Sequence, residues 1–154
     1  MRIIALATAA ILIATQGAAL SCLRPDPVTT FERLNDDSSS YYLLLGTLDF
    51  NASLLPKGVV NEERTPAPIA ANFKGFGLTK RGFTTPFERP VTLQPVCFGP
   101  WCGNEVPGIK SLFFAKVAGD DVVINSDPCG GTSFPNPSRQ TLDAMTACMN
   151  GNCP

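Results

Sequence analysis

The sequence predicts a mainly β protein, built as a small closed barrel of five strands with a short helical turn before it and a helix after it. Three observations lead to this prediction. Five runs of aliphatic and aromatic residues are separated by glycine, proline and polar turn residues. Apolar residues recur at helical spacing near the end of the chain. Six cysteines follow an apolar N-terminal segment, which favours a fold stapled by disulfides.

The N-terminus has the pattern of a secretory signal peptide. Arg2 precedes an apolar run at residues 3–14, and small and polar residues follow it. This run is shorter than the roughly 20 residues that a membrane-spanning helix needs, and no later segment is apolar enough to span a membrane. We expect residues 1–19 to be removed, or residues 1–21 as the alternative, and the protein to be secreted or periplasmic. A lipid anchor at Cys22 is a less favoured alternative.

Residues 20–154 are predicted to form one domain. Thr29 and Glu32 make a capping-box pattern for a helical turn that runs through Leu34. Gly46 interrupts the first strand, where a glycine often marks a bulge or a sharp coil. The last two strands are joined by a Gly119-Asp120 turn and form the clearest hairpin. The five strands are predicted at residues 41–50, 69–79, 83–96, 111–118 and 121–124.

The last predicted element is a helix that Asn136 caps, Pro137 begins and Gly151 ends. One stripe of this helix is expected in the core, and it holds Leu142, Met145 and Met149. Five glycine-bent strands and one helix suit an OB-like closed barrel, the oligonucleotide/oligosaccharide-binding type, which leaves no exposed sheet edge. A two-sheet sandwich of about seven strands is the alternative.

The absence of histidine argues against catalysis. A serine–histidine triad, a cysteine–histidine pair and a catalytic zinc held by histidine cannot form within this chain. Acidic residues occur in adjacent pairs, which on a strand would point to opposite faces. We therefore predict that the protein is not an enzyme and has no catalytic residue, cofactor or metal ion. A net charge of −1 gives no sign of a nucleic-acid partner.

The cysteines are expected to form three disulfides, but six cysteines allow 15 pairings and the sequence cannot choose among them. Four residues separate Cys97 from Cys102, whereas thiol oxidoreductases place two between their cysteines, so we interpret this loop as structural. Trp101 in the same loop is either an exposed anchor for a partner or packed on a disulfide, and packing is slightly favoured.

The chain resembles the netrin-like family, whose best-known members are the tissue inhibitors of metalloproteinases. The similar features are Cys97 at a strand end, the hairpin at residues 111–124, Cys129, and a helix that ends near Cys148 and Cys153. The start, Cys22-Leu-Arg-Pro-Asp-Pro followed by a short helix and a strand, is similar as well. Pairing of Cys22 with Cys97 or Cys102, as the family implies, stays open. The pairing that we adopt is Cys22–Cys129, Cys97–Cys102 and Cys148–Cys153.

The resemblance implies a binding function. In the inhibitors, the α-amine and carbonyl oxygen of a first cysteine chelate the zinc of the protease. Carried over, Cys22 would be the chelator in this chain, with Leu23, Arg24 and Pro25 beside it in the cleft of a metalloprotease-like partner. The inhibitors have two cysteines at this position, and this sequence has one. We expect an exported, non-catalytic binding module of the inhibitor kind. The alternative is a structural or envelope-associated protein with no inhibitory activity.

Overall fold

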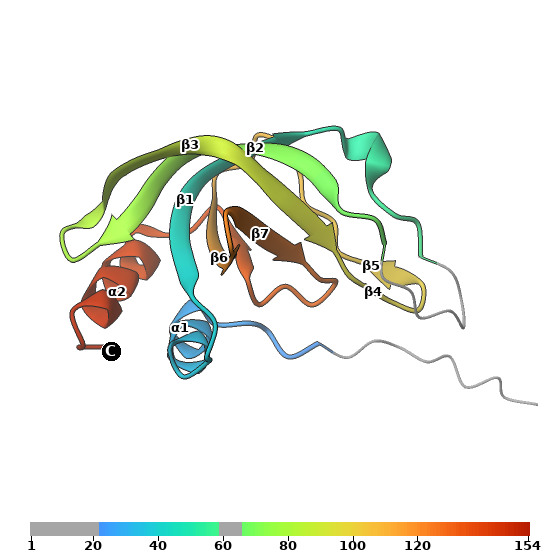
Figure 1. Cartoon of the computed structure of the whole chain (residues 1–154). Coiled ribbons are helices and arrows are strands. Elements are labelled where there is room, and N and C mark those ends of the chain that lie inside the picture. The colour runs from blue at the N-terminus through green and yellow to red at the C-terminus, as the bar shows by residue number, and fades with distance from the viewer. Residues whose placement is uncertain (1–21, 59–65) are drawn as a thin grey trace, which may run out of the picture.

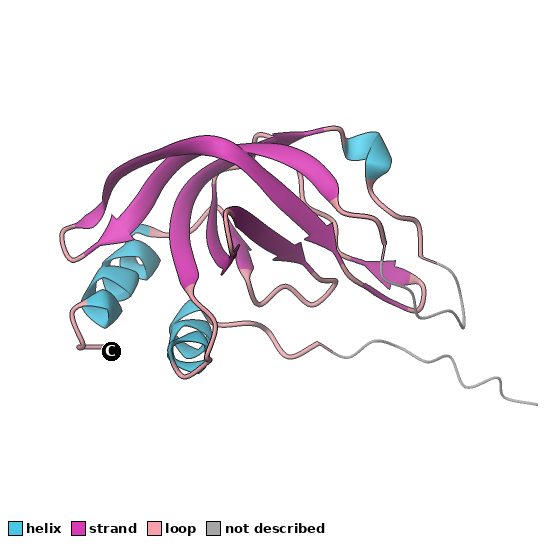
Figure 2. Ribbon diagram, viewed as in Figure 1, coloured by secondary structure: helices cyan, strands magenta, loops and turns pink. Residues whose placement is uncertain are grey.

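The computed structural model describes residues 22–58 and 66–154. The predicted signal peptide lies outside the described residues. Figures 1 and 2 show a strongly curved sheet that closes on itself, with two helices against one side. The elements in chain order are α1 (Pro27–Asn35), β1 (Tyr41–Phe50), the 3-10 turn η1 (Ala52–Leu54), β2 (Ile69–Thr79), β3 (Gly82–Pro95), β4 (Cys97–Phe98), β5 (Trp101–Cys102), β6 (Ser111–Ala118), β7 (Asp121–Ser126), β8 (Ser133–Pro135) and α2 (Arg139–Met149).

Five strands close into a barrel, which confirms the predicted fold class. β1 pairs antiparallel with β2 and with β6, β2 pairs with β3, and β6 pairs with β7. A parallel pairing of β3 with β7 completes the ring. The short strand β8 pairs with the beginning of β6. The β2–β3 hairpin forms the long arch over the barrel in Figure 1. Within the described part of the chain, no helix has the length and apolar character needed to cross a bilayer.

Strands β1 and β6 are buried on both faces, because one face lines the barrel and the helices cover the other. Leu44 and Phe113 are partners in the β1–β6 ladder and belong to the core inside the barrel. A second core, between the barrel wall and the two helices, contains Leu43, Phe114, Leu34 of α1 and Met145 of α2. Successive residues of one strand therefore enter different cores, which explains the unbroken apolar run at the start of β1.

Gly46 lies opposite Gly75 in the β1–β2 ladder, and the pairing continues through both residues without a register shift. A Cβ atom on Gly46 would collide with the carbonyl oxygen of Lys74, and one on Gly75 would collide with the carbonyl oxygen of Leu45. No bulge forms at Gly46, and its role is the close approach of two strongly curved strands. The register shift in the β2–β3 ladder lies between Gly77 and Leu78.

The helix caps differ from those predicted. The N-cap of α1 is Asp26, whose carboxylate accepts a hydrogen bond from the Thr29 backbone N–H at 2.9 Å, and Pro27 begins the helix. Proline suits the first helical position because its missing N–H would have no partner there. The helix therefore starts two residues before the predicted Thr29 cap. The N-cap of α2 is Ser138, not Asn136, because the Ser138 hydroxyl accepts a hydrogen bond from the Thr141 N–H at 3.1 Å. The helix therefore begins at Arg139 and not at the predicted Pro137.

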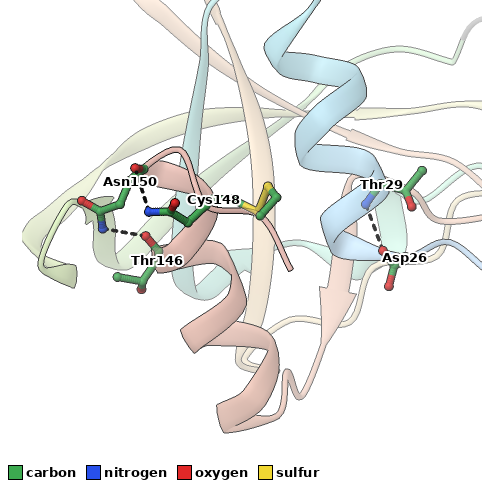
Figure 3. Close-up of a disulfide and its surroundings, with 7 residues drawn as sticks. Asp26, Thr29, Thr146, Cys148 and Asn150 are labelled. Carbon is green, nitrogen blue, oxygen red and sulfur yellow. Dashed lines mark hydrogen bonds between the residues drawn. A yellow bond between two sulfur atoms is a disulfide. The ribbon is translucent and has the colours of Figure 1, made fainter.

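Three disulfides join the pairs expected in the sequence analysis: Cys22–Cys129, Cys97–Cys102 and Cys148–Cys153. The first closes the longest loop, with a sequence separation of 107. In the chain-entropy model, a cross-link over about 100 residues contributes about 4 to 5 kcal/mol. Cys148–Cys153 fastens the C-terminal residues to α2, and Figure 3 shows it beside the hydrogen bond from the Asn150 side-chain amide to the Thr146 carbonyl oxygen, 2.8 Å long. Three disulfides are typical of proteins in oxidising compartments.

Gly46→Ala is expected to destabilise the barrel, because the added Cβ has no room between β1 and β2. Overpacking of a well-packed site typically costs about 1 to 3 kcal/mol. Urea denaturation followed by circular dichroism measures this loss in the free energy of unfolding. Gly77→Ala in β2 is the matched control, since a Cβ atom there would meet its nearest neighbours at 3.9 Å. Equal stability of the two variants would contradict the close approach at Gly46.

Candidate functional site

The parallel pairing of β3 with β7 brings the segments that follow these strands to the same end of the barrel. Pro95 ends β3 and lies beside Ser126, which ends β7. The Val96 N–H donates to the Ser126 carbonyl oxygen at 2.8 Å, and the Gly103 N–H donates to the Val96 carbonyl oxygen at 2.9 Å. The polypeptide after β3 is thereby held against the end of β7.

The β4–β5 hairpin projects from this end of the barrel, on the right in Figure 1. Its base is the Cys97–Cys102 disulfide, and Phe98 pairs with Trp101 across it. Trp101 is 38% exposed and Phe98 is 43% exposed. Both rings of the hairpin are therefore partly accessible, and contact of Trp101 with the disulfide stays a prediction.

The N-terminal segment reaches the same end of the barrel. The Cys22–Cys129 disulfide attaches it to the loop after β7. Pro25 packs beside Gly130 of that loop, where an added Cβ would meet the Pro25 Cγ at 3.2 Å. Leu23 is 93% exposed, and Arg24 is exposed as well. We call residues 22–25, 96–110 and 127–136 together the hairpin end.

The hairpin end collects the exposed apolar side chains of the protein. Among the described residues, eight large hydrophobic side chains are exposed, and five of them belong to the hairpin end. These five are Leu23, Phe98, Trp101, Val106 and Ile109. Exposed hydrophobic residues that occur singly are normal on a protein surface, whereas a concentration of them marks an interaction site.

A cavity of about 420 Å³ lies within the hairpin end, between residues 102–111 and residues 127–136. The Gly108 N–H donates to the Leu48 carbonyl oxygen at 2.8 Å, and the Asn136 N–H donates to the Lys110 carbonyl oxygen at 2.9 Å, so that both walls are fixed. The lining is mixed. It includes the apolar side chains Val106, Ile109, Pro128 and Pro135 and the carboxyl groups of Glu105 and Asp127.

The two carboxyl groups have raised pKa values. Burial is the largest cause of the raised pKa of Glu105, and the nearby charge of Asp127 raises this pKa further. Hydrogen bonding to the hydroxyl groups of Ser133 and Ser126 lowers it in part. Burial also raises the pKa of Asp127, against hydrogen bonds from the backbone N–H groups of Cys129 and Gly130 and the more distant charge of Arg33. One of these bonds, from Cys129 to the Asp127 Oδ1, is 2.9 Å long.

Glu105 and Asp127 were not recognised as site residues from the sequence. Each is a single acidic residue in a loop, and nothing in the local pattern relates residue 105 to residue 127. Only the β3–β7 pairing brings them to one cavity. All five predicted partner-binding residues lie at the hairpin end. They are Cys22, Leu23, Arg24, Pro25 and Trp101. The described residues contain no cluster of three or more histidine, cysteine, aspartate or glutamate side chains that could hold a metal ion.

Comparison with known proteins assigns no family. No protein-family model matches the chain, and no curated protein and no solved structure is significantly similar to it. The resemblance to the netrin-like family therefore stays a hypothesis, which the cysteine positions and the barrel motivate.

Glu105→Gln is expected to alter the pH dependence of stability. Because the pKa of Glu105 in the folded protein lies above its ordinary value of 4.5, the folded state holds this proton more tightly than the unfolded chain does. Wild-type stability therefore falls as the pH rises from 4.5 through the folded-state pKa. The glutamine variant lacks this loss.

The measurement is the free energy of unfolding in urea at a series of pH values between about 4 and about 8. The free energy of unfolding of the variant should rise steadily relative to that of the wild type as the pH increases across this range. Asp143→Asn removes an exposed carboxyl group from α2 and serves as the control. A difference between wild type and Glu105→Gln that does not change with pH would show that burial does not raise the Glu105 pKa.

Proposed function

We propose that this chain is an exported binding module, and that the hairpin end is its contact surface for a protein partner. The observation that carries the proposal is the concentration of five exposed apolar side chains on segments held by two disulfides. Aromatic side chains such as Phe98 and Trp101 are typical anchors of protein interfaces. Export is inferred from the N-terminal signal pattern together with the disulfides.

Disulfides and prolines preorganise this surface. Cys22 is cross-linked to Cys129, Pro25 packs on Gly130, and Pro27 begins α1. The segment before α1 therefore has few alternative conformations to lose when a partner binds, and less lost entropy means higher affinity. The Cys97–Cys102 disulfide restricts the β4–β5 hairpin in the same way.

We further propose that the partner is a zinc metalloprotease. This step rests on the netrin-like resemblance and on the position of Cys22. Its sulfur is in the disulfide, so only the α-amine and the carbonyl oxygen of Cys22 are available as zinc ligands. The α-amine is free only if the signal peptidase cleaves after Ser21. Leu23 and Arg24, both exposed, would then extend from the metal into the substrate cleft.

Mass spectrometry of the exported, unreduced protein gives the first residue, and inhibition of a zinc metalloprotease gives the activity. We expect a chain that begins at Cys22 to inhibit. A chain with one alanine added before Cys22 keeps the disulfide but displaces the α-amine. Its inhibition should be weaker by roughly 100-fold, equivalent to about 2.7 kcal/mol. A mature chain that begins at Leu20, together with unchanged protease rates, would favour the structural or envelope-associated alternative.

Leu23→Ala and Trp101→Ala are each expected to weaken binding to the protease by roughly tenfold or more, because truncation of an interface anchor costs about 1 to 2 kcal/mol or more. Surface plasmon resonance with the protease measures the change. Leu54→Ala is the matched control, since Leu54 is also exposed but lies in η1. If all three variants bind equally, the hairpin end is not the contact surface.

A further inference from the structure

We propose that the cavity in the hairpin end accepts a lysine or arginine side chain of the protein partner, with Glu105 and Asp127 as its charge partners. This inference rests on the proposed binding function and specifies the chemistry of the partner. It does not depend on the partner being a protease, nor on zinc chelation by Cys22.

The cavity carries negative charge without a matching cation. Among the described residues, neither Glu105 nor Asp127 forms an ion pair. The salt bridge that the described residues do form joins Lys74 to Glu88, away from the cavity. Arg33 influences Asp127 from a distance only. Two partly buried carboxylates that face one cavity repel each other, and a positive charge placed between them would remove that repulsion.

Ser126 points to the same conclusion from a second direction. Its side chain is 2% exposed, and its Oγ has no well-directed hydrogen bond. The hydroxyl lies close enough to the Glu105 carboxyl to lower its pKa. Buried polar atoms without partners are rare in folded proteins and cost about 1 to 3 kcal/mol. The Glu105 carboxyl therefore lies beside a buried hydroxyl that lacks a well-directed partner in the described part of the chain.

The shape and lining suit a long basic side chain better than a bare metal ion. Val106, Ile109 and Pro135 offer apolar contact at the walls, and the carboxyl groups offer charge. Lysine and arginine have an aliphatic stem and a charged head, and they bury the stem on apolar surface. A calcium ion needs six to eight oxygen ligands, more than two carboxyl groups supply. The cavity volume of about 420 Å³ leaves room for a side chain.

The probe is the peptide acetyl-Gly-Arg-Gly-amide, titrated into the full disulfide-bonded protein and followed by amide chemical shifts in NMR. Its matched control is the citrulline peptide, which has nearly the same shape but no charge. We expect shifts in residues 102–111 and 127–136, and binding at least tenfold tighter for the arginine peptide. Higher salt should weaken the binding, because it screens charges.

The double variant Glu105→Gln/Asp127→Asn should lose this preference by tenfold or more, whereas Asp143→Asn on α2 should keep it. The amide spectra of both variants report whether they fold. Equal binding of the arginine and citrulline peptides would overturn the proposal, as would unchanged arginine binding by the folded double variant.

Failure of this proposal is distinguishable from failure of the proposed function. Leu23→Ala and the alanine-extended N-terminus should leave binding of the arginine peptide unchanged, because neither change touches the cavity lining. Loss of protease binding with intact peptide binding would reject the protease partner and keep the cavity assignment. Intact protease binding with no binding of the arginine peptide would reject the cavity assignment alone.

Discussion

The parallel pairing of β3 with β7 is the constraint on which the rest of the structure depends. It closes the barrel, and it also places the segments that follow β3 and β7 at the same end of the barrel. An antiparallel pairing would send the segments after the two strands to opposite ends. In the observed arrangement both segments leave at one end, and one cavity forms between them. The Cys22–Cys129 disulfide then holds the N-terminal end of the described residues at this end of the barrel.

The second constraint is the burial of β1 and β6 on both faces. A barrel of five strands has a small interior, and its core of Leu44, Phe73, Phe113 and their neighbours fills it. The helices α1 and α2 add an outer layer against Leu43, Leu112 and Phe114. They cover the side of the barrel near the tip of the β2–β3 hairpin, where Asn150 donates to the Lys80 carbonyl oxygen at 3.0 Å, and they leave the opposite end open for contact (Figure 1).

Sequence reasoning worked where the signal is local and periodic. The apolar runs between turn residues, the Gly119-Asp120 turn and the late helix were sufficient to predict the barrel, and β6–β7 is the hairpin expected. The helix caps were misassigned because Asp26 and Ser138 compete with nearby residues that fit the same pattern. The exposure of Trp101 depends on how far its hairpin projects. The cavity could not be predicted, since Glu105 and Asp127 become neighbours only through a pairing between strands distant in sequence.

The β4–β5 hairpin is closed by its own disulfide, and the Cys97 side chain is buried while the four residues between the cysteines lie outward or at the surface. No main-barrel ladder runs through these four residues. The exposed residues of the hairpin therefore lie outside the ladders of the barrel, although the Pro100 backbone approaches Gly58 too closely for a side chain at that position. A library that randomises positions 98 and 101, and keeps Pro100 and the left-handed Gly99 with its φ of 57°, would sample new binding specificities on the same barrel, which makes this small protein a starting point for engineered binding reagents.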